Sequence, residues 1–181
     1  IGGGMAYTFS KAQGYAIGNS LLEEDRLAMA RRLLEQGGDK IVLPLDNVVT
    51  DRLDIRGGRI GDLRTTAVDA IPEDCSGVDI GPQTLQAFEK VLRQARTVVW
   101  NGPMGVFELE AAAKGTYAIA RLLAEITGQG ATTVIGGGDS ARAVAEAGVS
   151  DRVSHVSTGG GASLEMLEGK VLPGVAALTD K

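Results

Sequence analysis

TTVIGGGDSA, residues 132–141, gives the clearest indication of the fold, because four β-branched residues lead into three glycines and then into helix-like sequence. Two further glycine triplets, residues 2–4 and 159–161, also lie where a strand would give way to a helix. Glycine lets the backbone approach a bulky ligand and adopt positive φ angles. A helix that begins just after such a loop directs free N–H groups and the positive end of its dipole toward it. The sequence therefore predicts several loops suited to phosphate at one edge of a sheet.

Short β-rich runs alternate with helical patterns along the chain, which is typical of a parallel α/β sheet. Strands are expected over residues 40–49, 77–80, 97–100, 132–135 and 153–157, and helices over about 20–36, 82–92, 110–127, 139–147 and 161–168. Ser20 and Glu23 match a capping box that opens the first helix, and residues 54–60 suggest a small hairpin. The predicted fold is a three-layer αβα sandwich with a mostly parallel, Rossmann-like sheet.

The composition fits one globular domain of 181 residues, with 44% apolar and 23% charged residues. A formal net charge of −5 argues against a large nucleic-acid surface. Cys75 is the sole cysteine, so no disulfide framework is expected. No apolar run reaches the length of a membrane span, and a cytoplasmic monomer is expected. The chain opens directly at a glycine loop that a strand should precede, which predicts a fragment without its opening strand and helix.

The loop at residues 136–141 matches the dinucleotide pattern G-x-G-x-x-A, but two features disfavour a nicotinamide-dependent oxidoreductase. The next strand ends His155-Val156-Ser157 without the carboxylate that holds the ribose. Asp139 would also repel a pyrophosphate. It can instead cap the following helix or bind Mg²⁺ together with substrate phosphates, and the two roles are compatible. His155 and Cys75 are expected to be structural.

WNGPMGVFE, residues 100–108, leaves a buried strand, turns through Asn-Gly-Pro and ends at a carboxylate. A wide turn at the carboxyl edge of a parallel sheet is where open α/β folds bind ligands. Gly102 and Gly105 permit close approach, Val106 can pack on a base, and Glu108 can accept hydrogen bonds from a sugar. A plain structural turn with Glu108 as a helix cap is the alternative.

These strings together resemble the phosphoglycerate kinase family. IGGGMAYTF (1–9), WNGPMGVFE (100–108), IGGGDS (135–140) and VSTGGGASLEMLEGK (156–170) are similar, in this order, to its C-terminal, nucleotide-binding half, and span essentially the whole chain. The resemblance implies a glycolytic kinase that transfers a phosphoryl group between 1,3-bisphosphoglycerate and ADP, giving 3-phosphoglycerate and ATP, with Mg²⁺. It implies no nucleic-acid or membrane partner.

The resemblance also implies roles for individual residues. The nucleotide site would comprise Gly2, Gly3, Leu21, Gly77, Asn101, Pro103, Gly105, Val106, Glu108, Gly137, Gly138, Asp139 and Ser140. Within it, Glu108 would bind the ribose and Asp139 the magnesium ion. Gly138 and Gly161 would offer catalytic N–H groups to the transferring phosphoryl group.

Two departures from the family pattern bear on activity. Ser140 stands where many members have threonine, and both residues carry a hydroxyl. The family's G-A-K-V segment and its N-terminal substrate domain are absent from the sequence. Residues 1–181 are therefore expected to be the C-terminal domain, able to bind nucleotide but scarcely to catalyse. A non-catalytic nucleotide-binding fragment stays open as the alternative.

Overall fold

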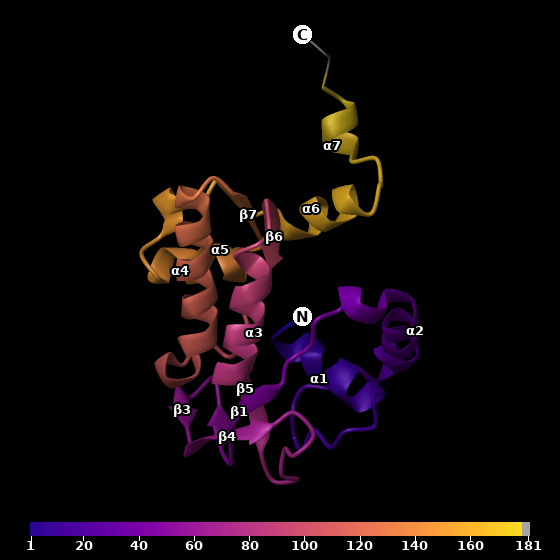
Figure 1. Ribbon diagram of the computed structural model, residues 1–181, viewed down its shortest axis with the longest axis vertical. Helices are drawn as coiled ribbons and strands as arrows, with labels where there is room; N and C mark the ends of the chain where they lie inside the picture. Colours follow the sequence, from indigo (N-terminus) through magenta and orange to yellow (C-terminus); the bar gives the residue numbers. More distant parts are fainter. Residues whose placement is uncertain (179–181) are drawn as a thin grey trace.

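The computed structural model describes residues 1–178, which form helices and short strands around a central apolar core (Figure 1). The helices are α1 Gly4–Ala12, α2 Leu27–Gly37, α3 Pro82–Leu92, α4 Lys114–Gly128, α5 Gly138–Glu146, α6 Gly160–Leu167 and α7 Pro173–Ala176. The strands are β1 Asp46–Thr50, β2 Leu53–Asp54, β3 Arg59–Ile60, β4 Leu63–Ala67, β5 Ser76–Ile80, β6 Thr97–Asn101, β7 Thr132–Gly136 and β8 His155–Ser157. The α/β class predicted from the sequence is confirmed.

A parallel sheet in the order β6-β7-β8 positions the glycine loops. Its register aligns Asn101 with Gly136, and Gly136 with Ser157. The carboxyl ends of the three strands therefore lie along one edge, as the alternating pattern predicted. Helix α4 contacts β7 and packs beside α3 (Figure 1), while α5 contacts β7 and β8.

The strands between residues 46 and 80 differ from the expectation of one mostly parallel sheet. They form a separate antiparallel sheet in the order β4-β1-β5. Only a short excursion, the β2–β3 hairpin, separates β1 from β4, and a connection without a crossover helix favours antiparallel pairing. The hairpin suggested at residues 54–60 is thereby confirmed, with β2 beginning at Leu53. The strand expected over residues 40–49 begins only at Asp46.

The start of α3 is set by a contact distant in sequence, and the helix start predicted at Ser20 is not observed. The buried Asp46 carboxylate accepts hydrogen bonds from the backbone N–H groups of Gln83 (3.0 Å) and Thr84 (2.8 Å) and so caps α3. The capping box predicted at Ser20 is wrong, because α2 begins at Leu27. The Ser20 hydroxyl instead accepts from the N–H of Gly77, at 2.9 Å.

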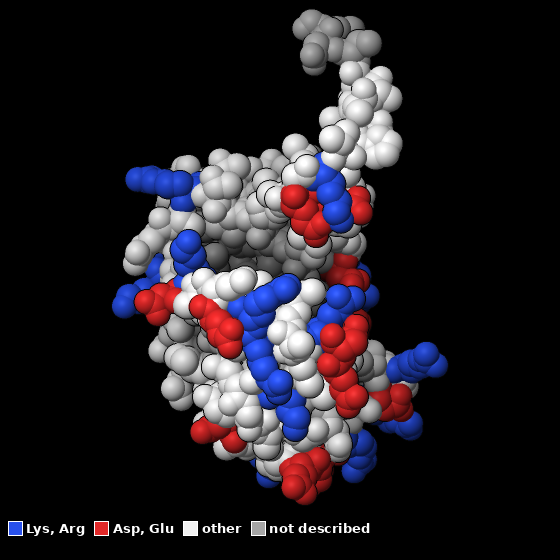
Figure 2. All heavy atoms as spheres, turned by 90° about the vertical axis from the view of Figure 1, so that its right-hand side faces the viewer, with Lys and Arg blue, Asp and Glu red and all other residues white. Residues whose placement is uncertain are grey.

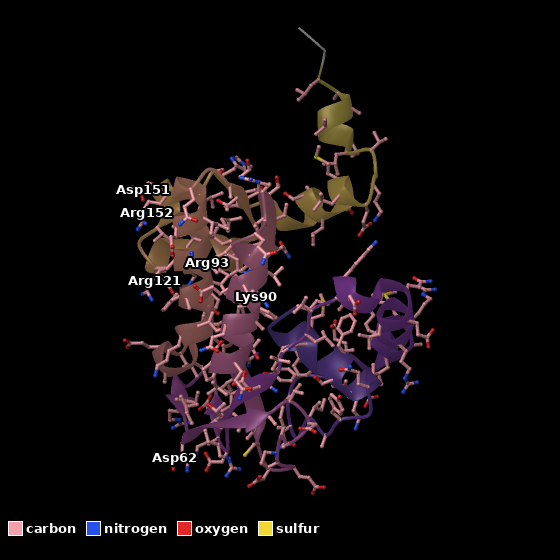
Figure 3. All side chains as sticks on the ribbon, viewed as in Figure 1. Asp62, Lys90, Arg93, Arg121, Asp151 and Arg152 are labelled. Carbon is pink, nitrogen blue, oxygen red and sulfur yellow. The ribbon has the colours of Figure 1, made fainter. Side chains whose placement is uncertain are left out.

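Charges are spread over the outer surface. On the face shown in Figure 2, acidic and basic side chains are mixed over the body of the molecule. Figure 3 shows Arg93, the residue directly after α3, beside α4, where its guanidinium binds the Glu125 carboxylate at 2.7 and 3.0 Å. Helices α6 and α7 project away from the body (Figure 1) and expose Leu167 and Val175. Among residues 1–178, no helix is both long enough and apolar enough to cross a bilayer.

Candidate functional site

Two of the glycine loops meet at the carboxyl edge of the parallel sheet. Gly137 has a φ of 91°, which side chains rarely tolerate. A Cβ atom added to Gly160 would lie 2.6 Å from the Gly137 Cα and 2.8 Å from the Asn101 Oδ1. Only glycine therefore allows the loops after β7 and β8 to touch beside Asn101. Helices α5 and α6 begin in these loops and direct their free N–H groups toward this edge.

A cavity of about 1110 Å³ opens next to this edge. Of the residues predicted for the nucleotide site, it is lined by Gly2, Gly3, Leu21, Gly77, Asn101, Pro103, Gly105 and Val106. Its volume is slightly above the usual range of about 300–1,000 Å³ for small-molecule sites. Asn101 both lines this cavity and lies against Gly137 and Gly160. It therefore joins the cavity to the glycine loops.

The first glycine loop is fixed against the loop that follows β6. The Gly3 N–H donates to the Met104 carbonyl oxygen at 3.1 Å. Gly3 has a φ of 65°, and a Cβ atom there would lie 2.5 Å from the Pro103 carbonyl oxygen. This wall of the cavity thus also depends on glycine.

The remaining predicted residues lie outside the cavity lining. Gly138, Asp139 and Gly161 are exposed near the starts of α5 and α6. Glu108 is exposed beyond the cavity, so its ribose role stays a prediction. Ser140 is fully buried, and its hydroxyl accepts a hydrogen bond from the Gly102 N–H at 2.7 Å. That hydroxyl therefore holds the neighbouring loop.

Asp139 suits a magnesium ion that is shared with a ligand. The α5 helix has Gly137 as its N-cap and no side-chain capping bond, so the capping role considered for Asp139 is not seen. Within residues 1–178, no group of three or more His, Cys, Asp or Glu side chains could form a complete metal cage. Mg²⁺ is commonly held by one or two carboxylates together with substrate phosphates. An exposed carboxylate beside a phosphate-suited loop fits that chemistry.

Two buried polar residues near the site went unnoticed in the sequence. Asp79, at 2% exposure, accepts hydrogen bonds from the backbone N–H groups of Gly115 (2.7 Å) and Ile80 (2.9 Å). Burial raises the pKa of Asp79 to about 6, although these hydrogen bonds and Lys114 act in the opposite direction. The Thr116 hydroxyl accepts from the N–H groups of Met104 and Gly105. A charged residue inside the apolar strand Val78–Ile80 was the available signal for Asp79.

The Asp79 carboxyl should make stability depend on pH. Its pKa is raised from 3.8 to about 6, so the folded chain holds this proton more tightly than the unfolded chain. Between pH 4 and 6.5 the free energy of unfolding should therefore fall as pH rises, by about 2 kcal/mol from this group. Urea unfolding across this range measures the slope. Asp79→Asn, which cannot ionise, should show a smaller fall, and equal slopes would contradict the assignment.

Taken together, these features define an α/β domain of the class that binds phosphorylated ligands at the carboxyl edge of a parallel sheet. The family model for phosphoglycerate kinase matches residues 1–170. The chain therefore belongs to the phosphoglycerate kinase family.

Individual relatives agree with this assignment. Phosphoglycerate kinase from Latilactobacillus sakei is 54% identical over 182 residues, covering 100% of this chain and 43% of that protein. The structure of phosphoglycerate kinase from Coxiella burnetii has a TM-score of 0.87 at 42% identity, covering 97% of this chain and 44% of that one. The enzyme from Pyrococcus horikoshii has a TM-score of 0.79 at 29% identity. The chain thus spans less than half the length of these relatives.

Proposed function

We propose that this chain is the C-terminal, nucleotide-binding part of a phosphoglycerate kinase. It would bind ADP or ATP with magnesium for the reversible transfer of a phosphoryl group between 1,3-bisphosphoglycerate and ADP. The observation that carries the proposal is the continuity, through Asn101, of a mainly apolar cavity with two glycine loops. An adenosine needs an apolar cavity with few polar groups, and its phosphates need backbone N–H groups and a metal ion.

The adenosine and the phosphates of the nucleotide would contact two different sets of residues. Gly2, Gly3, Leu21, Gly77, Pro103, Gly105 and Val106 would surround the adenosine, with Glu108 at the ribose. Gly137, Gly138, Asp139 and Ser140 would lie along the phosphates, next to Asn101. Bound magnesium would neutralise part of the phosphate charge, and Asp139 would hold it.

The N–H groups of Gly138 and Gly161 would face the transferring phosphoryl group. Phosphoryl transfer depends mainly on positioning and charge stabilisation, and exposed N–H groups at helix starts supply both. The substrate that carries or accepts the phosphoryl group would bind to a domain outside this sequence. We therefore expect residues 1–181 alone to bind nucleotide without appreciable turnover.

Asp139→Ala should weaken ADP binding chiefly when magnesium is present. The variant loses the proposed metal ligand while the phosphate-binding N–H groups stay in place. A loss of one charge-assisted contact corresponds to roughly tenfold in affinity or more. Calorimetric titrations with magnesium and with EDTA measure the ADP affinity in the presence and in the absence of the metal ion. The control is Asp151→Ala, which removes an exposed acid outside the site. Equal affinities of native and variant chains for MgADP would contradict the metal role.

A further inference from the structure

The loop at residues 102–106 is fixed to four parts of the fold. Its backbone N–H at Gly102 donates to the Ser140 hydroxyl on α5, at 2.7 Å. The Met104 carbonyl accepts from Gly3 at 3.1 Å, and the Val106 N–H donates to the Val78 carbonyl on β5 at 2.7 Å. The fourth attachment is to α4 and has no part in the site described above.

That fourth attachment is a single side chain, Thr116. Its hydroxyl oxygen accepts from the N–H of Met104 at 3.0 Å and from that of Gly105 at 3.3 Å. Thr116 is fully buried in the first turn of α4 and does not line the cavity. The loop residues that it holds do line the cavity. One hydroxyl thus satisfies two consecutive backbone groups at the tip of the loop.

The position of Thr116 is itself fixed. The preceding residue, Gly115, donates its N–H to the buried Asp79 carboxylate at 2.7 Å. A Cβ atom at Gly115 would lie 2.5 Å from the Ile80 Cγ1, so α4 starts in close contact with β5. Close packing of this kind leaves the threonine hydroxyl little freedom to follow a moving loop.

We propose that Thr116 is a positioning residue for the base-binding wall of the cavity, acting through the Met104 and Gly105 N–H groups without touching the ligand. This inference rests on the proposed nucleotide site. Loss of the hydroxyl frees two neighbouring N–H groups that have no other protein partner within residues 1–178, so the loop becomes mobile. The Gly137 N–H donates to the Ser157 carbonyl oxygen at 3.0 Å, so the loops after β7 and β8 are joined without Thr116 and keep their geometry.

The test compares ADP with inorganic pyrophosphate in calorimetric titrations of the 181-residue chain with magnesium. Thr116→Val keeps the shape of the side chain and removes the acceptor, so it should weaken ADP at least tenfold and pyrophosphate less than twofold. Thr116→Ser keeps the hydroxyl and should bind ADP within threefold of the native chain. Thr127→Val removes a hydroxyl near the opposite end of α4, bonded to the Leu123 carbonyl at 2.6 Å, and should leave both affinities unchanged.

A merely structural role for Thr116 predicts a different pattern. Thr116→Val and Thr127→Val would then lower the melting temperature alike, with ADP and pyrophosphate affected equally. That outcome, or native-like ADP affinity in Thr116→Val, overturns the inference.

Amide hydrogen exchange measures, without any ligand, whether Thr116 restrains the loop at residues 102–106. In Thr116→Val the Met104 and Gly105 amides should exchange at least tenfold faster than in the native chain, while Gly137 is unchanged. If the native chain binds no ADP, the proposed function fails, and this exchange alone decides whether Thr116 holds the loop. Unchanged exchange at both amides overturns the inference. Thr116→Ala, which adds no methyl group against the amides, replaces the valine variant if that variant does not fold.

Discussion

Gly160→Ala is expected to reduce phosphate binding at least a hundredfold, because the charge-assisted hydrogen bonds that we propose from two loops depend on this position. The added Cβ atom would lie 2.6 Å from the Gly137 Cα, which is backbone and cannot rotate away. The loops after β7 and β8 must therefore separate. Titration of the variant with pyrophosphate and magnesium measures the loss.

Gly128→Ala is the matched control for this variant. It adds the same methyl group at the end of α4, where no described atom beyond the neighbouring backbone of its own helix lies within 4 Å of the new Cβ. Its affinity should equal that of the native chain, and circular dichroism should show both variants folded. Native-like pyrophosphate affinity in Gly160→Ala would show that the two loops do not act as one site.

Phe107→Ala should lower the free energy of unfolding by about 3–5 kcal/mol, the range for removing a buried aromatic ring. Phe107 is 2% exposed in the main core, directly after the loop that lines the cavity. The Arg142 guanidinium lies over its ring, 4.8 Å from the centroid. The variant therefore loses core packing and this cation–π contact together. Urea unfolding followed by circular dichroism measures the change.

Phe107→Leu separates packing from the aromatic contact, because leucine fills much of the volume without a π face. It should be destabilised by less than half as much as the alanine variant. A loss below about 1 kcal/mol for Phe107→Ala would contradict the placement of this ring in the core.

The parts of the fold that follow from local pattern were predictable from the sequence. The strand, glycine and helix succession at residues 132–141 appears as β7 and α5. Parallel strands end at a common edge of a sheet. The loops that follow three predicted strands were therefore expected to lie close together, and in the structure they bring together Asn101, Gly137 and Gly160. The resemblance also selected eight residues that line one cavity.

The parts that depend on partners distant in sequence were not predictable. The capping-box pattern at Ser20 is overridden by the N–H of Gly77, 57 residues away. The separate antiparallel sheet depends on which strands β1 meets, and the residues of β1 do not encode its neighbours. Asp79 was recognisable as a charge within an apolar strand, but its partner was not predictable, and Thr116 looked like an ordinary polar residue. Both roles exist only once α4 packs on β5 and on the loop after β6.

Calorimetric titration of the 181-residue chain with ADP, in magnesium and again in EDTA, tests the claim that this chain binds a nucleotide by itself. We expect saturable binding of one ADP per chain, tighter with magnesium than without it. The glycine loops and the cavity would then form a nucleotide site by themselves. No binding by a chain that circular dichroism shows to be folded would contradict the claim and would mean that the site needs residues beyond this sequence.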